Sequence, residues 1–254
     1  MIAVSDSQRR LTDEQHEDAA AMKAINSGAN GMPVGPGVSA VLARFGLTEL
    51  PPYKLGCPIC AEIDAARQAD ALVESIASEA KAREAAFLAI CPPEMAETDV
   101  ARLPSRERFQ RVLAWRYGAR GLVLHGNTGL GKTRSAWALL RRLSVDEGRR
   151  FIWMSSFVFS DKAVQAFRAG TAEQFINRLS ETPILFLDDL GKSKITLRVG
   201  EALFEVIDRR TTNRRPTIIT TNSVGDGLAS RFEDAEAGSP AVRRLRDYFD
   251  AISF

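Results

Sequence analysis

The sequence predicts an open, parallel α/β sheet over residues 106–254, preceded by a small and mainly helical N-terminal region. Three observations support this fold class. Short apolar runs alternate with helix-like segments throughout the second half of the chain, as in βαβ units. The run at 183–187 is continuously apolar, as expected of a central parallel strand that is covered on both faces. Before residue 106, connectors rich in glycine and proline separate helical segments instead.

The first 50 residues are expected to be a flexible segment. A polar stretch leads into a linker-like run at 27–37, and only residues 38–46 favour a short helix. Residues 51–105 are expected to form a helical, partner-binding module. Their run at 61–90 lacks glycine and proline and favours a helix of roughly 45 Å. Because its apolar positions are mostly alanine, this helix suits an arm or a partner-binding surface better than a core.

The third part, residues 106–254, carries the α/β pattern. Residues 171–174 have the form of a capping box, and the Ser-Pro pair at 239–240 is typical of an N-cap followed by the first helical residue. The expected strands are 121–125, 151–154, 183–187, 216–221 and 251–254, and the expected helices are 106–117, 134–143, 171–179, 198–210 and 239–248.

Composition excludes several classes of protein. The 254 residues are 45% hydrophobic and 26% charged, which is ordinary for a globular domain. No apolar run approaches the roughly 20 residues of a membrane-spanning helix, and the N-terminus is too polar for a secretory signal. Three cysteines do not make a disulfide framework, so the sequence favours a cytoplasmic protein with no membrane partner.

The most specific motif is Gly-Asn-Thr-Gly-Leu-Gly-Lys-Thr at 126–133, which fits the phosphate-binding pattern G-x-x-x-x-G-K-[ST]. Glycines let successive backbone N–H groups turn toward phosphate oxygens, and the N-terminus of the following helix adds partial positive charge. Lys132 is expected to reach the β- and γ-phosphates, and the Thr133 hydroxyl is expected to hold Mg²⁺. The candidate residues for binding ATP are Gly126, Asn127, Thr128, Gly129, Leu130, Gly131, Lys132, Thr133 and Arg134.

Two acidic residues follow the continuous apolar strand. Asp188 is expected to join the Mg²⁺ shell, directly or through water, and Asp189 is expected to polarise the attacking water. Asn222 ends the next expected strand and is expected to hold the water or the γ-phosphate from the opposite side. The sequence therefore indicates an ATPase site at the carboxyl edge of the sheet.

Together these motifs resemble the AAA+ ATPases, and more narrowly the DnaC/IstB-type group of replicative helicase loaders and transposition helper ATPases. The resemblance covers about 111–254 and rests on the motif at 126–133, Leu-Phe-Leu-Asp-Asp-Leu-Gly at 185–191, Ile-Ile-Thr-Thr-Asn at 218–222 and Arg-Arg-Leu-Arg at 243–246. It implies a P-loop AAA+ core in which Asp188 and Asp189 are the Walker B pair and Asn222 is sensor 1. It also implies an arginine finger that reaches the γ-phosphate bound by a neighbouring subunit. Arg244 is the first candidate for this finger, and Arg231 is the alternative.

Two departures from the family pattern bear on activity. Many AAA+ proteins carry glutamate where this chain has Asp189, and the shorter side chain retreats from the attacking water. The chain also stops at Phe254, directly after the last expected strand, so the helical lid of a full AAA+ module is expected to be absent or reduced. The resemblance therefore implies an ATPase that is weak, or that is stimulated by a partner or by DNA.

Charge is unevenly spread along the chain. Residues 1–110 hold 11 basic and 16 acidic residues, a balance of −5, whereas residues 111–254 hold 23 and 16, a balance of +7. One basic cluster, at 192–198, is expected to face a channel that holds single-stranded DNA. For a second cluster, at 209–215, cations at a helix C-terminus are the favoured explanation. Aromatic residues are not interleaved with either cluster, so sequence-specific readout is not expected.

Cys57 and Cys60 have the spacing of half a zinc site. The other residues with a thiol or imidazole group are Cys91, His16 and His125. His125 abuts the phosphate-binding motif, and Cys91 is expected to be a packed thiol. One interpretation of the pair is therefore a zinc site that is shared between two chains. The other interpretation is that the pair is the remnant of a zinc-binding module.

Three functions stay open on the sequence. The first is a loader that uses ATP to place a hexameric, DnaB-type replicative helicase on single-stranded DNA. Such a loader would work as a homo-oligomer and would grip the helicase through its acidic N-terminal region. The second is a transposition helper ATPase, for which a basic, DNA-binding N-terminal region would be expected. The third is a nucleotide-dependent adaptor with little turnover. The long helix and the separate N-terminal module favour the loader or the adaptor.

Overall fold

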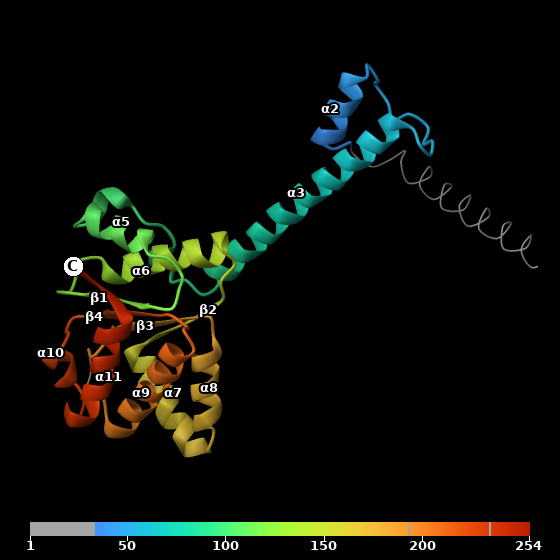
Figure 1. Cartoon of the computed structure of the whole chain (residues 1–254). Coiled ribbons are helices and arrows are strands. Elements are labelled where there is room, and N and C mark those ends of the chain that lie inside the picture. Colours follow the sequence, from blue (N-terminus) through green and yellow to red (C-terminus); the bar gives the residue numbers. More distant parts are fainter. Residues whose placement is uncertain (1–33, 193, 234) are drawn as a thin grey trace, which may run out of the picture. The chain divides into compact units, whose positions relative to one another are not determined.

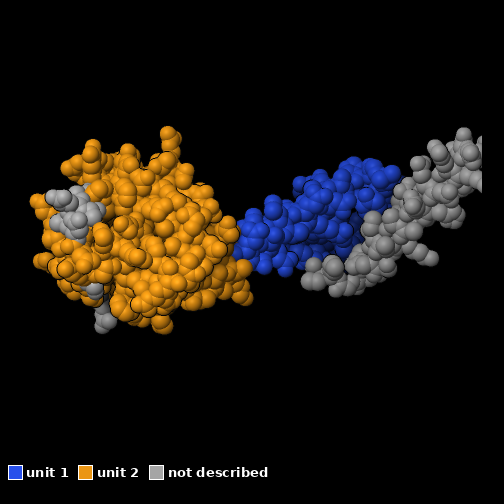
Figure 2. Space-filling model, turned by 90° about the horizontal axis from the view of Figure 1, so that it is seen from below, with its two compact units in different colours: residues 1–79 blue, residues 80–254 orange. Residues whose placement is uncertain are grey.

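The computed structural model describes residues 34–192, 194–233 and 235–254. Most of the expected flexible segment, including most of its linker-like run, lies outside these residues, as does His16. The chain divides into two compact units, Met1–Glu79 and Ala80–Phe254, which Figure 2 distinguishes by colour.

The described part of the first unit is built from two helices. α2 (Pro36–Arg44) and the beginning of α3 (Pro58–Leu88) pack around a small apolar cluster that contains Val38, Leu42 and Ile63. The run without glycine or proline thus forms the long helix that the sequence predicts. Neither α3 nor any other helix in the described ranges is both long and apolar enough to cross a membrane.

A carboxylate of α3 caps α2. The backbone N–H groups of Gly37 and Val38 donate to the side chain of Asp70, at 3.0 and 3.3 Å. These N–H groups lie in the first turn of α2, where no intrahelical acceptor is available, so Asp70 satisfies them and fixes α2 on α3.

The second unit contains a parallel sheet of five strands in the order β2-β3-β4-β1-β5 (Figure 1). The strands are β1 (Gly121–His125), β2 (Phe151–Ser155), β3 (Ile184–Leu190), β4 (Thr217–Thr221) and β5 (Phe249–Ser253). All five lie where the sequence predicts strands, which confirms the α/β fold class. Because the strands are parallel, the residues that follow β1, β3 and β4 meet at one edge of the sheet.

Helices cover both faces of this sheet. They are α4 (Pro93–Ala96), α5 (Arg106–Ala114), α6 (Lys132–Arg141), α7 (Ser156–Ala169), α8 (Ala172–Glu181), α9 (Leu197–Thr212), α10 (Asp226–Ala229) and α11 (Ala235–Tyr248), with a 3₁₀ turn at Val100–Arg102 and a π turn at Arg142–Asp146. In Figure 1, α5 and α6 lie on one face, where Trp137 and Phe186 belong to one apolar cluster. α7, α8, α9 and α11 lie on the other face, where Leu203 and Ile219 belong to a second cluster.

α7 is a helix that the sequence pattern does not predict. β2 ends at Ser155 and α7 begins at the next residue, so no glycine or proline marks the change. The Ser155 hydroxyl accepts a hydrogen bond from the N–H of Val158 at 3.3 Å and caps the helix. A serine cap of this kind can be predicted from a sequence only when the last residue of the preceding strand is known.

One predicted helix start is wrong, and another is right but lacks its predicted cap: α8 begins at Ala172, directly after Thr171, as the sequence predicts. Thr171 precedes α8 with φ −110° and ψ 19°, which is not the extended conformation of an N-cap, and its side chain makes no capping bond. α11 begins at Ala235 rather than after Ser239, and Pro240 lies inside the helix. Since proline has no N–H, α11 forgoes one internal hydrogen bond at this point.

A buried arginine joins α8, α9 and the beginnings of β3 and β4. Arg210 is fully buried, and its Nη1 donates to the carbonyl oxygens of Leu179 and Thr182 at 2.6 and 2.7 Å. Its Nη2 donates to the Pro216 carbonyl, and its Nε lies 2.9 Å from the hydroxyl of Thr217. Burial lowers the pKa of Arg210 to about 9, so the guanidinium stays charged at neutral pH. Its partners are mainly backbone carbonyls that would otherwise be buried without donors.

Candidate nucleotide-binding site

The phosphate-binding motif forms the turn between β1 and α6. Gly126, Gly129 and Gly131 have φ angles of 138°, 84° and 90°, a region that residues with a Cβ rarely adopt. At Gly126 a Cβ would also lie 2.3 Å from the carbonyl oxygen of Phe254. The backbone therefore requires the glycines of the motif. α6 begins at Lys132, so the first N–H groups of a ten-residue helix are open to an anion.

The side chain of Lys132 is almost fully buried and bridges the loop to β4. Its Nζ lies 2.8 Å from the carbonyl oxygens of Gly126 and Asn127 and 2.9 Å from Oδ1 of Asn222. Asn222 also donates from Nδ2 to the Thr128 hydroxyl at 3.3 Å. Burial lowers the pKa of Lys132, and the two aspartates of β3 act in the opposite direction. The structure thus brings together the predicted lysine and the predicted Asn222.

β3 brings the first of its aspartates against the loop. The hydroxyls of Thr133 and Thr220 both donate to Oδ1 of Asp188, at 2.8 and 2.5 Å. Burial raises the pKa of Asp188, and the hydrogen bonds from Thr220 and Thr133 lower it. Hydroxyl and carboxylate oxygens are the ligands that Mg²⁺ prefers. The residues present at this point therefore fit the metal that the sequence predicts.

The second aspartate sits in an irregular part of β3. The register of β3 against β4 shifts between Leu187 and Leu190, and Asp189 has a φ of 57°. Its backbone N–H donates to the Thr220 hydroxyl at 2.8 Å. Its carboxylate lies 3.1 Å from Nζ of Lys192 in an exposed ion pair. Asp189 is therefore at the same edge as Asp188, but its carboxylate is engaged by a lysine.

A cavity of about 630 Å³ adjoins the loop on the side of α4. Gly129, Gly131 and Arg134 line it from the loop and α6, and the Arg134 guanidinium donates to the carbonyl oxygen of Glu97 at 2.8 Å. The remaining lining residues come from the segment before β1: Pro93, Glu94, Glu97, Thr98, Asp99, Leu103 and Pro104. This cavity is the space beside the phosphate loop that could receive the rest of a nucleotide.

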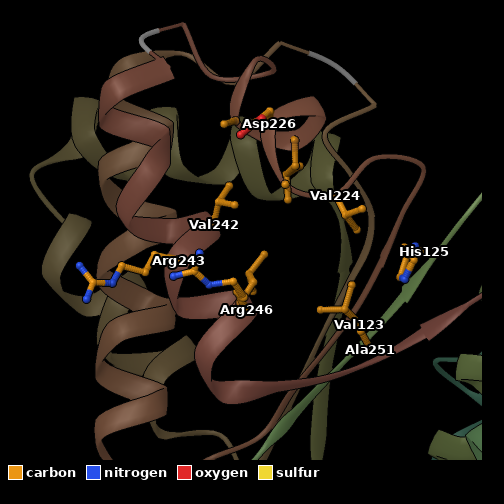
Figure 3. A pocket seen from close by; sticks show the side chains of 12 residues that line it. Val123, His125, Val224, Asp226, Val242, Arg243, Arg246 and Ala251 are labelled. Carbon is orange, nitrogen blue, oxygen red and sulfur yellow. The ribbon is translucent and has the colours of Figure 1, made fainter.

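A second cavity, of about 520 Å³, lies on the other side of β1 (Figure 3). Val123 and His125 of β1 lie on one side of it, and Val242 and Arg246 of α11 lie on the other. Asp226 of α10 lies above them in the view of Figure 3. Burial, and to a lesser degree Lys132, lower the pKa of His125, so this imidazole favours its neutral form. No predicted nucleotide-binding residue lines this cavity.

The two candidate arginine fingers lie on different elements. Arg244 of α11 pairs with Asp208 of α9 at 2.5 Å, and its guanidinium lies 5.4 Å from the ring centre of Tyr248. Arg231 is exposed just after α10, and its side-chain stem lies close to Gly191. Arg231 has no ion pair with any residue that the structure describes. Both roles stay predictions, because the fingers would act on a neighbouring subunit.

The cysteine pair belongs to the first unit. Cys57 is half-buried immediately before α3, and Cys60 is buried one turn later. Hydrogen bonds from Cys60 lower the pKa of the Cys57 thiol. Within the described ranges, no group of three or more His, Cys, Asp or Glu side chains is gathered that could hold a metal ion. The interpretation of a zinc site shared between two chains stays a prediction. Cys91 is buried in the second unit, as expected of a packed thiol.

The sequence did not single out Thr220. A threonine in a strand is an ordinary β-former, and only the register of β3 against β4 shows that its hydroxyl meets both aspartates. The available signal was its spacing. Thr220 and Asn222 are two residues apart, so in an extended strand their side chains share a face.

Comparisons with known proteins identify the family of the chain. The family described as IstB-like ATP binding protein matches residues 102–252. The replicative helicase loader DnaI of Bacillus subtilis is 25% identical over 190 residues, which cover 72% of this chain and 58% of that protein. Protein Rv3427c of a Mycobacterium tuberculosis insertion sequence is 28% identical over 138 residues, which cover 53% of each chain. The chain thus spans between half and three fifths of the length of these relatives.

Solved structures show the same fold. A crystal structure of DnaI gives a TM-score of 0.53 at 20% identity, covering 65% of this chain and 94% of that one. A crystal structure of the DnaC helicase loader gives a TM-score of 0.50 at 24% identity, covering 62% of this chain and 92% of that one. The fold is therefore the P-loop AAA+ core of these proteins, with a helical region before it. Since the family match spans more than half of the sequence, the chain belongs to the IstB-like ATP binding proteins.

Proposed function

We propose that this protein is an ATPase that loads a hexameric, DnaB-type replicative helicase onto single-stranded DNA. The observation that carries the proposal is the hydrogen bond of 2.8 Å from the Thr133 hydroxyl to Asp188, which joins the phosphate loop to the acidic end of β3. This contact creates a site for a metal-bound nucleotide at the edge where ligands of open α/β sheets bind. The loader DnaI covers a larger share of this chain than does the insertion-sequence relative, 72% against 53%.

In this proposal the loop residues bind the phosphates of ATP. The backbone N–H groups of 126–133 and the N-terminus of α6 surround the phosphate oxygens. Lys132 exchanges one of its three present acceptors for a β- or γ-phosphate oxygen. Thr133 and Asp188 would hold Mg²⁺, which supplies charge neutralisation between the β- and γ-phosphates when it is bound. Arg134 and the cavity beside it would receive the base and sugar.

Hydrolysis requires a group that orients water, and Asp189 is the proposed one. Its carboxylate must leave Lys192, 3.1 Å away, before it can accept a hydrogen bond from water. Asn222 would hold the γ-phosphate or the water from the side of β4, since its amide already contacts Lys132 and Thr128. The competition for Asp189 supports slow basal turnover.

The arginine finger is proposed to be Arg244, with Arg231 as the alternative. Arg244→Ala should lower turnover by about 10³-fold or more and spare ATP binding. Arg243→Ala is the control on the same helix, because the ion pair of Arg243 with Asp247, at 3.6 Å, is long and exposed. Mixing Arg244→Ala subunits with Lys132→Ala subunits should restore part of the activity, since each then supplies what the other lacks. Loss of activity in Arg231→Ala, with Arg244→Ala active, would transfer the role to Arg231.

Single-stranded DNA is the proposed nucleic acid. Lys192, Lys194 and Arg198 are exposed after β3, and the aromatic ring of Phe157 is 73% exposed just after β2. Ser155 of β2 pairs with Asp188 of β3, so these segments leave the sheet at the same edge. A base can stack on an exposed aromatic ring while lysines contact the backbone. By contrast, residues of the second basic cluster are used within the protein: Arg209 pairs with Glu173 and Glu205 at 3.1 and 2.5 Å, and Arg210 is buried.

The helicase is proposed to bind the N-terminal region. Leu72, Val73 and Ile76 of α3 are 61%, 67% and 55% exposed, and their spacing places them on one side of the helix. Large apolar side chains on an otherwise polar helix suit a protein partner. Residues 1–110 also carry a charge balance of −5, from 11 basic and 16 acidic residues.

The test is the size of the protein in solution with ATP and Mg²⁺, with and without a DnaB-type hexameric helicase, measured by light scattering. The proposal expects a stable mixed complex that takes up single-stranded DNA in preference to duplex. Lys132→Ala is the control for dependence on the nucleotide. ATP-driven self-assembly on duplex DNA without helicase binding would favour a transposition helper instead. Binding of the helicase without measurable ATP turnover would favour the third function, a nucleotide-dependent adaptor.

A further inference from the structure

We propose that Thr220 is a positioning residue for Mg²⁺: its buried hydroxyl orients Asp188 and fixes the backbone of Asp189, so that one oxygen of Asp188 is presented to the metal. The inference rests on the proposed binding of Mg²⁺ and ATP. It adds a residue that belongs neither to the phosphate-binding motif nor to the acidic pair.

The need for such a residue comes from the irregularity in β3. β3 and β4 pair regularly up to Leu187, and pairing resumes only where Leu190 lies opposite Thr221. Between these points Asp189 has a φ of 57°, so the chain leaves the extended conformation. The Asp189 N–H then donates to the Thr220 hydroxyl at 2.8 Å. A side-chain oxygen thus takes the place that a backbone carbonyl has in a regular ladder.

A hydroxyl that accepts one hydrogen bond still has its single proton to donate. The Thr220 oxygen accepts from Asp189, and its proton is directed to Oδ1 of Asp188 at 2.5 Å. Thr220 is fully buried, so water does not compete for either bond. Hydrogen bonds to a carboxylate are short and comparatively strong, so the two aspartates are tied to one atom of β4.

A second hydroxyl, that of Thr133, donates to the same oxygen of Asp188, and this determines which oxygens remain as metal ligands. Thr133 donates to Oδ1 of Asp188 at 2.8 Å, so both hydroxyl hydrogen bonds to this carboxylate fall on Oδ1. The Thr133 hydroxyl uses its proton on Asp188 and still has two lone pairs, which a metal ion can share. Thr220 and Thr133 therefore fix the carboxylate while leaving Oδ2 and the Thr133 oxygen as metal ligands.

The experiment compares ATP affinity in EDTA with ATP affinity across a Mg²⁺ titration, using the whole chain. Thr220→Val removes the hydroxyl and keeps the shape of the side chain. It is expected to weaken the apparent Mg²⁺ affinity by about 10- to 100-fold, as loss of a group that orients a metal ligand does. ATP affinity in EDTA is expected to stay unchanged, and Thr220→Ser is expected to restore Mg²⁺ affinity.

Thr221→Val is the matched control. Thr221 is the next residue of β4 and is equally buried, but its hydroxyl oxygen lies 2.7 and 2.9 Å from the carbonyl oxygens of Leu190 and Ser223. It is expected to lower thermal stability without changing Mg²⁺ affinity. If Thr220→Val does not fold, Thr220→Cys takes its place against Thr220→Ser, since a thiol is a weak donor of similar size.

The outcomes separate this inference from the proposed function. Wild-type Mg²⁺ affinity in Thr220→Val or Thr220→Cys overturns the positioning role while ATP binding stands. An equal loss of Mg²⁺ affinity in Thr221→Val also overturns it, because general loosening of β4 would then explain both. If the wild-type chain binds no ATP, or binds it without regard to Mg²⁺, the proposed function fails and this inference fails with it.

Discussion

The two compact units differ in how their side chains are used. In the second unit, apolar clusters fill both faces of the sheet, and polar side chains at its edges are engaged by several partners each. In the described part of the first unit, one small cluster around Val38, Leu42 and Ile63 holds the helices together, and large apolar side chains further along α3 are exposed. A site that discriminates phosphate oxygens needs atoms fixed within fractions of an ångström. A surface that docks a protein can instead leave its apolar area uncovered until the partner arrives.

Among substitutions that test this difference between the units, the largest change in stability is expected at Arg210. Arg210→Met should destabilise the second unit by about 3–5 kcal/mol, because the carbonyl oxygens of Leu179, Thr182 and Pro216 would be left buried without a donor. The measurement is the free energy of unfolding from denaturant titration. Arg209→Met, which removes a solvent-accessible ion pair one residue away, is the control and should change the free energy of unfolding far less. If Arg210→Met lowers the free energy of unfolding as little as the control does, the buried guanidinium does not stabilise the beginnings of β3 and β4.

The next largest effect is expected in the first unit, on the binding of a partner protein. Leu72→Ser combined with Ile76→Ser should weaken binding of the proposed helicase partner by roughly 2 kcal/mol or more, which is about 30-fold. Because both side chains are more than half exposed, the same change should move the free energy of unfolding by about 0.5 kcal/mol or less. Affinity is measured by titration calorimetry with the full chain. Glu74→Ser, on the opposite side of the helix, is the control. Unchanged affinity in the double variant would exclude this stripe as the docking surface.

The same contrast explains what the sequence could predict. The strands and the phosphate loop were predictable because each depends on residues that are neighbours in the chain, such as the apolar run before Asp188 and the glycines of 126–133. Thr220 was not, because its partners lie 31 and 32 residues away, and a shift in register determines whether they meet. Pro240 is a case of the opposite kind, since a strong local signal for a helix start was overridden by a helix that begins at Ala235.

A smaller effect is expected from Lys192, the exposed partner of a catalytic candidate. Lys192→Ala should raise basal ATP turnover by up to about fivefold, because it frees Asp189 from an ion pair of 3.1 Å between exposed side chains, and such pairs contribute about 1 kcal/mol at most. Steady-state turnover without DNA is the measurement, at low and high salt. The increase should shrink at high salt, which already screens the pair. Lys194→Ala controls for the loss of a positive charge. A decrease in turnover would show that Lys192 assists the reaction rather than competing for Asp189.

The smallest effect concerns His125, the last residue of β1. Burial, and then the charge of Lys132, hold its pKa below the usual value of 6.5. Between the folded and the unfolded pKa, the unfolded chain binds more protons than the folded one, so the free energy of unfolding rises with pH across that window and reaches its full value above about 6.5. Stability from this group is lost as pH falls through the folded pKa. His125→Gln should therefore flatten the slope of unfolding free energy against pH in the window just below about pH 6.5. If the slope survives in His125→Gln, titrating groups other than this imidazole account for it, and protonation of His125 does not change the free energy of unfolding.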